Sequence, residues 1–314
     1  MFYRGKKITT KKVLKFIKRK MVDDIFFKYS FNLWQMCGFH VTQNCFYEPI
    51  PDTKKLAPDT FKKISSLSGV DVHENKQLEI LNKFRNEFKK EFDLIPFDTR
   101  NKNEYFINND SFASVDGEIL YCMIRFLKPK RIYEIGSGNS TLLIVQATEK
   151  NKEETGLECE IISIDPYHDD MIKNIAPGKI KLLVKKVENL DLSIFDCLEE
   201  NDILFIDSSH VLKIGSDVQY EYLDLLPRLN KGVFVHVHDI FLPAEYPKDW
   251  VLKEHRFWNE QYLLQAFLSF NDSFEIVLAN SYLHLKHSEK LKETFNSYDR
   301  NKNWPASFWI KKIK

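Results

Sequence analysis

From residue 131 to the end of the chain, short apolar runs alternate with longer stretches of helical periodicity. The apolar runs are RIYEI (131–135), EIISID (160–165), IKLLV (180–184), DILFID (202–207), GVFVHV (232–237), FEIVLAN (274–280) and SFWIKKI (307–313). Helical stretches separate the first five runs, at 141–150, 168–175, 192–200 and 217–229. Strands that alternate with helices indicate βαβ units, which build a parallel sheet covered by helices on both faces.

The last two apolar runs differ from the others, because no helix-sized apolar segment lies between them. We therefore expect the last strand to pair antiparallel at that edge of the sheet. The predicted fold is α/β: a Rossmann-like, doubly wound, mainly parallel seven-stranded sheet with an antiparallel last strand.

The first 112 residues follow a helical pattern with loops. Apolar residues recur at spacings of three and four from Leu78 to Phe92, which predicts an amphipathic helix over 76–92. A second helix is expected over 115–128, ended by Pro129. We therefore predict a helical N-terminal extension over 1–112, which caps the site or mediates self-association into a homo-oligomer, and a sheet domain over 113–314.

Composition narrows the class of protein. The 314 residues are 43% hydrophobic and carry a net charge of +1, which does not favour bulk binding to polyanions, and no nucleic-acid motif is visible. No apolar run is long enough for a membrane span, and we expect no signal peptide. The five scattered cysteines predict reduced thiols and a cytoplasmic protein.

The first twenty residues carry nine Lys or Arg and no acid, with apolar residues among them. This pattern predicts a short basic amphipathic helix. It has two interpretations: a peripheral contact with the inner face of a membrane, or a solvated terminal helix with a few core contacts.

Polar groups follow several of the predicted strands. In a doubly wound sheet, ligands bind beyond the carboxyl ends of the strands. The first strand ends at Glu134 and the turn Gly136-Ser137-Gly138, and the second ends at Asp165. The later strands contribute the following groups: Asp207, His210, His236, His238 and Asp239. We expect these groups to converge on one rim of the sheet.

The glycine turn predicts a cofactor site. Gly136 and Gly138 allow a tight turn and close approach of a ligand, and the helix start near Ser140 and Thr141 directs N–H groups toward it. Asp165 suits a ribose, because a carboxylate accepts from both hydroxyls. A dinucleotide fingerprint needs a third glycine where Thr141 stands and an acid about 20 residues on, whereas Asp165 lies 27 residues past Gly138.

The segments EIGSGNST (134–141) and ISIDP (162–166) resemble the first two motifs of class I S-adenosylmethionine-dependent methyltransferases. The stretch from 201 to 251 is similar to a bacterial family associated with glycan and antibiotic tailoring, and GFHVTQNCFYEPIPD (38–52) also resembles its N-terminal part. The resemblance covers about residue 38 to the end, and it implies S-adenosylmethionine as cofactor. The predicted cofactor-binding residues are Glu134, Gly136, Ser137, Gly138, Ser140, Thr141, Asp165 and Glu188.

The groups after strands four and five predict the chemistry. In catechol-type O-methyltransferases the matching positions bind a metal, which implies Asp207, His238 and Asp239 as ligands of Mg²⁺ or Mn²⁺. Alternatively His210 or His238, held by a carboxylate, acts as a base. The predicted catalytic residues are Asp207, His210, His238 and Asp239.

The expected reaction is O-methylation of a sugar, glycan precursor or related small metabolite. Two other classes of function stay open. One is an NAD(P)-dependent oxidoreductase on a similar sheet, and the other is a non-catalytic scaffold that retains the fold.

Overall fold

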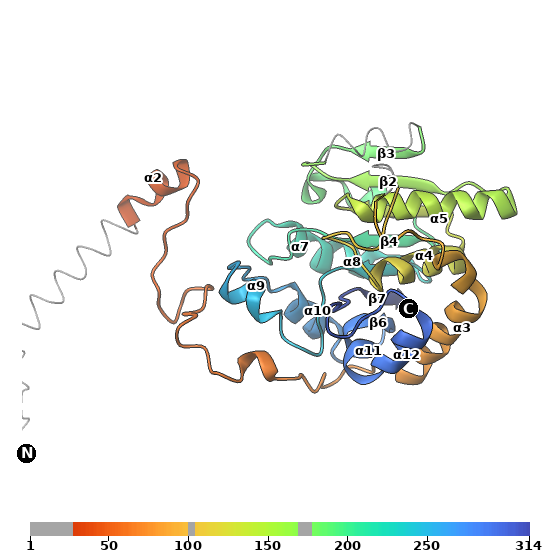
Figure 1. Cartoon of the computed structure of the whole chain (residues 1–314). Coiled ribbons are helices and arrows are strands. Elements are labelled where there is room, and N and C mark those ends of the chain that lie inside the picture. The colour runs from red at the N-terminus through yellow and green to blue at the C-terminus, as the bar shows by residue number, and fades with distance from the viewer. Residues whose placement is uncertain (1–27, 100–103, 169–177) are drawn as a thin grey trace, which may run out of the picture. The chain divides into compact units, whose positions relative to one another are not determined.

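The computed structural model describes residues 28–99, 104–168 and 178–314. The chain divides into two compact units, residues 1–58 and 59–314. In the first unit, the described part holds helix α2 (Phe31–Met36), none of whose residues is buried. The second unit holds a seven-stranded sheet and the helices that cover it (Figure 1).

The strand order is β3-β2-β1-β4-β5-β7-β6. The strands are β1 (Arg131–Ile135), β2 (Glu160–Ile164), β3 (Ile180–Leu183), β4 (Ile203–Ile206), β5 (Phe234–Val237), β6 (Phe274–Ala279) and β7 (Phe308–Lys312). Strands β1 to β5 are parallel, and β7 pairs antiparallel with both β5 and β6. The predicted fold class is confirmed, with one correction: β7 lies between β5 and β6, so β6 rather than the last strand forms the edge.

Side chains alternate between the two faces of the sheet, as the strand geometry requires. On β1, Ile132 joins the core with helices α3 (Glu74–Phe92), α4 (Asp116–Leu127) and α5 (Asn139–Thr155). Its neighbour Tyr133 joins the second core, with the helical segment 217–228 and α10 (Glu260–Leu268). Both faces are therefore buried, which explains the nearly continuous apolar runs of the parallel strands.

The helical segment 217–228 changes its winding midway. It runs as α7 (Asp217–Tyr220), the π-helical turn η5 (Glu221–Leu225) and α8 (Leu226–Arg228). The Ser216 hydroxyl caps its start by accepting from the Gln219 N–H. The remaining short helices are η2 (Thr60–Lys62), η3 (Val187–Asn189), η4 (Leu192–Phe195), α9 (Lys248–Leu252), α11 (Asn280–Lys286) and α12 (Ser288–Thr294).

Some local predictions were wrong. Only the 3-10 turn η4 forms within the helix expected over 192–200, and two seven-residue helices, α11 and α12, lie between β6 and β7. These two helices each bury a narrow stripe, including Leu283 and Leu291, so they have no long apolar run to reveal them. The predicted helix at 168–175 and the basic helix at 1–20 lie largely or wholly outside the described residues.

The domain boundary that we place between residues 112 and 113 stays a prediction. Helix α3, which we assigned to the extension, belongs to the larger unit and packs on α4, α12 and β6. Arg125 of α4 joins these helices: it pairs with Glu91 of α3 at 2.7 Å and Glu154 of α5 at 2.5 Å. Helices α3, α4 and α5 are therefore joined through the buried Arg125 as well as through apolar contacts.

Candidate active site

A cleft of about 430 Å³ lies at the carboxyl ends of β1, β2 and β4. Its wall includes Gly136, Ser137, Asp165, Glu188, Asp207 and Asp217. We call this cleft the rim cleft. Five residues predicted from the sequence, Gly136, Ser137, Asp165, Glu188 and Asp207, thus share one concave site, as expected at the switch point of a doubly wound sheet.

The glycine turn is shaped by close backbone packing. Gly136 has a φ of +85°, and a Cβ at this position would lie 2.1 Å from the carbonyl oxygen of Asp207. Only glycine fits such an approach without a shift of the backbone. Gly138 is extended instead, and a Cβ there would meet no described atom within 4 Å. The two glycines therefore have different roles: Gly136 is a steric requirement, and Gly138 leaves space open.

Glu134 lies beneath this turn, fully buried. It accepts hydrogen bonds from the hydroxyls of Ser140 at 2.8 Å and Thr141 at 2.7 Å. Thr141 in turn accepts from the Gly138 N–H at 3.0 Å. Burial raises the pKa of Glu134 to about 8. Glu134, Ser140 and Thr141 form an internal brace for the turn and are not part of the cleft wall, so their predicted contact with a cofactor stays a prediction.

Asp165 connects β2 to the turn across the rim cleft. One of its carboxylate oxygens accepts from the Ser137 hydroxyl at 2.6 Å and the Ser137 N–H at 3.1 Å. The other accepts from the Tyr167 N–H at 2.7 Å. Asp165 and Ser137 are both partly exposed in the cleft, so a ligand with hydroxyl groups can reach this carboxylate.

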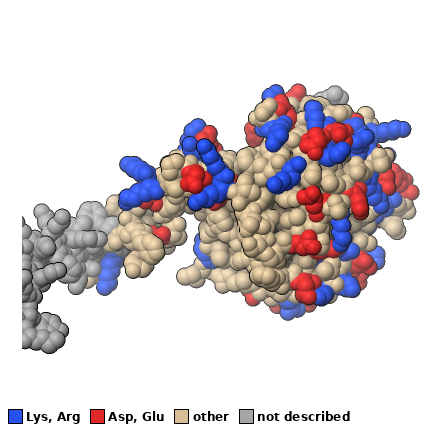
Figure 2. Space-filling view, turned by 90° about the horizontal axis from the view of Figure 1, so that it is seen from below, with Lys and Arg blue, Asp and Glu red and all other residues tan. Residues whose placement is uncertain are grey.

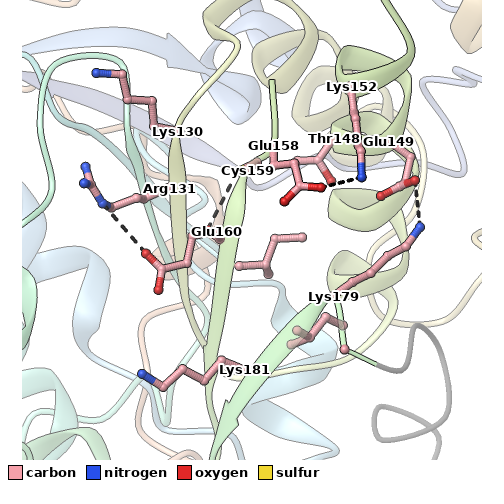
Figure 3. Close-up of a pocket in the computed structure, with 13 residues that line it drawn as sticks. Lys130, Arg131, Thr148, Glu149, Lys152, Glu158, Cys159, Glu160, Lys179 and Lys181 are labelled. Carbon is pink, nitrogen blue, oxygen red and sulfur yellow. Dashed lines mark hydrogen bonds and ion pairs between the residues drawn. The ribbon is translucent and has the colours of Figure 1, made fainter. Parts of the chain in front are cut away.

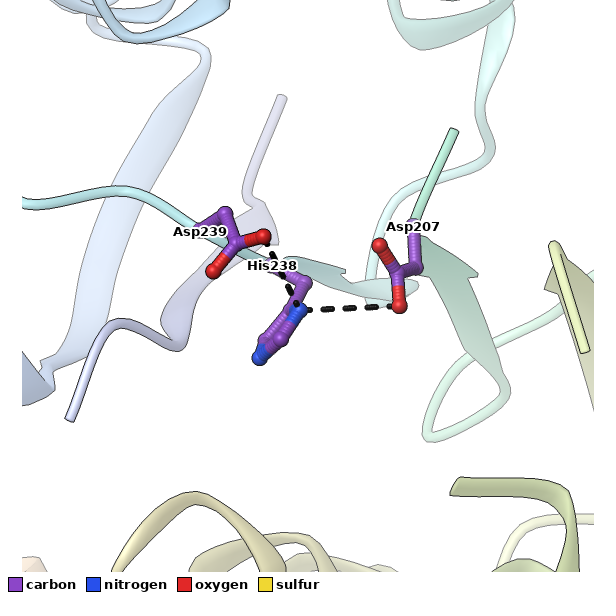
Figure 4. A group of neighbouring side chains, drawn as sticks. All are labelled: Asp207, His238 and Asp239. Carbon is purple, nitrogen blue, oxygen red and sulfur yellow. Dashed lines mark ion pairs between the residues drawn. The ribbon is translucent and has the colours of Figure 1, made fainter. Parts of the chain in front are cut away.

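Beside the rim cleft, acids and imidazoles gather at the ends of β4 and β5 (Figure 4). His238 Nδ1 lies 3.5 Å from Asp207 and 3.8 Å from Asp239. His210 Nε2 lies 3.2 Å from Asp207 and 3.7 Å from Asp239. We call Asp207, His210, His238 and Asp239 the acid–imidazole cluster; the structure brings all four predicted catalytic residues together.

The cluster favours charged imidazoles. Burial opposes the charged form of His238, but Asp239 and Asp207 outweigh it and raise its pKa to about 9. Burial also opposes the charged form of His210, yet hydrogen bonds to Asp207 and Glu260 raise its pKa well above the ordinary value. His238 is therefore protonated at neutral pH, and the pKa of His210 is shifted in the same direction, which weighs against either one as the first proton acceptor.

The two carboxylates of the cluster differ. Burial would raise the pKa of Asp207, but the charges and hydrogen bonds of His238 and His210 dominate and lower it. The pKa of Asp239 is raised, because burial outweighs the two imidazolium charges. The Asp207 side chain is 34% exposed and that of Asp239 16%, so both reach the rim.

Three further acids support the cluster, and the sequence pattern did not point to them. Glu260, at the start of α10, lies 2.8 Å from His210 Nδ1 and accepts from the Tyr222 hydroxyl at 2.9 Å. Asp116 heads α4, with an oxygen 4.0 Å from His238 Nε2. Glu221, in the π-helical turn, accepts from the Ser208 hydroxyl at 3.0 Å. Asp116 and Glu260 come from elements distant in sequence from the cluster, so no local spacing could reveal them.

His236 has a different place from the one expected. It is fully buried, its Nε2 lies 2.7 Å from the Ser307 hydroxyl, and its ring stacks on Phe205 at 4.0 Å. Burial lowers its pKa well below the ordinary value. His236 is a neutral packing residue behind the rim, whereas His238, on the same face, reaches the acids.

Asp207, His238 and Asp239 form a possible metal site, with one ligand atom of each within 4.8 Å of the others. Two carboxylates and an imidazole can hold Mg²⁺, Mn²⁺ or a softer ion. The imidazole must lose its proton to ligate, which couples metal binding to pH.

A second hollow, of about 580 Å³, lies at the opposite edge, where β1, β2 and β3 begin (Figure 3). Its charged side chains are largely paired: Arg131 lies 3.8 Å from Glu160, and Lys179 lies 2.7 Å from Glu149. On the face in Figure 2, acidic and basic side chains are likewise interspersed. The chemistry-bearing groups gather at the rim and not in this hollow.

The sheet order with an inserted antiparallel β7, together with a glycine turn after β1, defines a Rossmann-like methyltransferase fold. Residues 133–240 match the model of a methyltransferase domain family. An uncharacterized protein of Archaeoglobus fulgidus is 31% identical over 166 residues, which span 50% of this chain and 73% of that protein. The chain belongs to the same family as the archaeal protein, and it is an S-adenosylmethionine-dependent methyltransferase with that compound as cofactor.

Several solved structures are similar at low identity. The S-adenosylhomocysteine-bound methyltransferase PaMTH1 of Podospora anserina shares 18% identity, with 76% of this chain and 88% of that chain covered and a TM-score of 0.39. The O-methyltransferase of Bacillus cereus in complex with S-adenosylhomocysteine shares 11%, with 75% and 91% covered and a TM-score of 0.36. A CmcI structure with Mg and S-adenosylmethionine shares 15%, with 65% and 73% covered and a TM-score of 0.33.

Proposed function

We propose that the protein transfers a methyl group from S-adenosylmethionine to a hydroxyl of a sugar, a glycan precursor or a related small metabolite, as in glycan and antibiotic tailoring. The observation that carries this proposal is the position of Asp207, which belongs both to the rim cleft and to the acid–imidazole cluster. A cofactor in the cleft and an acceptor over the cluster would meet at this residue.

The rim cleft supplies the groups that we assign to the cofactor. Asp165 accepts from the ribose hydroxyls, and Glu188 lies on the adenine side. Gly136 and Ser137 form the wall of the cleft beside Asp207. Glu134, Ser140 and Thr141 brace the turn from behind and hold the start of α5.

The cluster supplies the proton acceptor. An alcohol must lose its proton as the new C–O bond forms, and the methyl group leaves the sulfonium as S-adenosylhomocysteine is released. The pKa values of His210 and His238 are both raised, which favours their charged forms, whereas Asp239 combines a raised pKa with a partly exposed carboxylate. We therefore assign the acceptor proton to Asp239, and to Asp207 the role of holding the two imidazoles in place.

Asp207, His238 and Asp239 would also hold a divalent cation. Bound there, Mg²⁺ or Mn²⁺ would supply Lewis-acid stabilisation of the acceptor oxygen. Calorimetric titration with Mg²⁺ in the presence of S-adenosylhomocysteine tests this assignment: heat that disappears in Asp239→Asn supports it, and equal heat in both proteins contradicts it.

The main experiment measures cofactor binding and turnover separately. Calorimetry with S-adenosylhomocysteine and with NADH distinguishes the methyltransferase from the oxidoreductase, because only the first should give heat. Asp239→Asn should keep binding of S-adenosylhomocysteine and lose methyl transfer to any acceptor found by screening. The control Asp224→Asn, exposed on η5, should keep both. Binding of NADH alone would overturn the proposal, and normal turnover by Asp239→Asn would overturn the assigned base.

We also propose a cytoplasmic location, with peripheral contact of the basic segment 1–20 to the inner face of a membrane and association into a homo-oligomer. Segment 1–20 lies outside the described residues. Within the residues that the structure describes, no helix combines the length and apolar character needed to cross a bilayer. Sedimentation with anionic and neutral vesicles tests the membrane contact.

A further inference from the structure

The antiparallel β7 brings a distant loop to the functional rim. Phe308, at the start of β7, pairs with Val237 at the end of β5 and with Ala279 at the end of β6. The loop that precedes β7 therefore reaches the same edge as the acid–imidazole cluster. Asp116 links the two directly, because its carboxylate accepts from the Ala306 N–H at 2.8 Å and lies 4.0 Å from His238.

Trp304, in this loop, is both exposed and held in place. The exposed fraction of Trp304 is 43%. Its indole N–H donates to the Ser281 hydroxyl at 2.9 Å, and that hydroxyl donates to the Phe241 carbonyl at 2.7 Å. The buried His284 stacks on it, with ring centroids 5.1 Å apart and an angle of 21°. Because this exposed indole is already ordered, little further conformational entropy is lost when a ligand binds to it.

A continuous line of aromatic contacts joins Trp304 to the cluster. Centroid distances are 6.1 Å from Trp304 to Phe241, 5.2 Å from Phe241 to Trp250 and 5.2 Å from Trp250 to Trp258. Trp258 then lies 4.3 Å from His210. These contacts fix the position of Trp304 relative to the cluster. Since Ala306, two residues further along the chain, is bonded to Asp116 beside His238, Trp304 lies in a loop at the same edge of the sheet as the acids.

We propose that Trp304 is a stacking platform for the acceptor and that it selects a neutral sugar ring. This inference rests on the proposed function. The apolar C–H face of a pyranose fits an indole face, and its hydroxyls suit the partly exposed acceptor oxygens of Asp207 and Asp239. With Asp116 and Glu260 beside the cluster, four carboxylates face two imidazoles, and this excess of negative charge disfavours an anionic acceptor. The platform thus contributes to affinity and orientation and takes no part in the chemical step.

The test uses the full chain saturated with S-adenosylhomocysteine and three neutral probes: the methyl α-pyranosides of glucose, galactose and mannose. Saturation-transfer NMR should show signals from their ring C–H protons, with weaker signals from glucuronate. Trp304→Ala should weaken the affinity for the bound probe about tenfold, and Trp304→Phe by less, because an aromatic face remains. Phe270→Ala is the matched control, since Phe270 is 89% exposed and precedes β6 at the opposite edge.

The outcomes separate the platform from the proposed function. Unchanged affinity for S-adenosylhomocysteine in Trp304→Ala shows that the variant is folded. A wild-type protein that binds S-adenosylhomocysteine but none of the three glycosides overturns the platform, as does a Trp304→Ala variant with wild-type sugar affinity. A wild-type protein that does not bind S-adenosylhomocysteine refutes the proposed function itself, and the platform with it.

Discussion

Glu134 offers a direct test of the electrostatics beneath the glycine turn. Glu134→Gln keeps the shape of the side chain and its capacity to bond with Ser140 and Thr141, but it removes the ionisable group. Since burial raises the pKa of Glu134 from an ordinary 4.5 to about 8, the folded state resists its ionisation. The unfolded chain ionises it freely, so wild-type stability falls as the pH rises from about 4.5 to about 8.

The size of the effect follows from the shift. Each unit of pKa difference corresponds to about 1.4 kcal/mol, so the variant should gain up to roughly 3 kcal/mol over wild type at about pH 7. The gain should be near zero at about pH 4 and complete above about pH 8, because both states are then ionised in the wild type. These numbers are upper limits, since relaxation around the buried charge reduces them.

Urea unfolding of both proteins at a series of pH values measures the difference directly. Subtracting wild type from variant cancels the other titrating groups, which both chains share. Glu87→Gln, exposed on α3, is the control and should give a difference that does not change with pH. A constant difference between Glu134→Gln and wild type across this range would refute the argument that burial holds Glu134 in its neutral form.

Two other predictions concern positions with clear structural roles. Gly136→Ala places a Cβ 2.1 Å from the Asp207 carbonyl oxygen at a φ of +85°. The variant should therefore lose about 2 kcal/mol or more of unfolding free energy, measured in urea, and should no longer bind S-adenosylhomocysteine in calorimetry. Normal binding would contradict the close approach. Arg125→Leu leaves Glu91 and Glu154 without their shared partner and should lower the free energy of unfolding by about 3 kcal/mol. The control Arg85→Leu breaks an exposed ion pair and should lower it by under about 1 kcal/mol. Similar losses for the two variants would contradict the role of burial.

Much of the fold follows from local pattern. Strands β1, β2, β4 and β5 are largely buried, so their apolar runs are dense and easily found, and β1 occupies the expected residues 131–135. Helices α11 and α12 were missed because each buries only a short stripe between two strands. The position of β7 between β5 and β6 depends on pairing with one segment about thirty residues away and another more than seventy residues away, which periodicity does not encode.

The candidate site was likewise predictable from the sequence only in part. The acid–imidazole cluster was predictable, because residues at the ends of adjacent parallel strands must share an edge. The protonation of His210 was not, since it depends on Glu260, fifty residues away in the chain. Trp304 was also missed, because its ordering by Ser281 and His284 exists only in the folded chain.

The insertion of β7 has a consequence for the order of assembly during synthesis. Strands β1 to β4 and the glycine turn emerge from the ribosome first and can form the nucleotide-binding half early. The acceptor half waits for residues 304–312, because β7 completes the pairing of both β5 and β6. If Trp304 is the proposed stacking platform, a nascent chain that stops before residue 304 would lack the group that selects the acceptor.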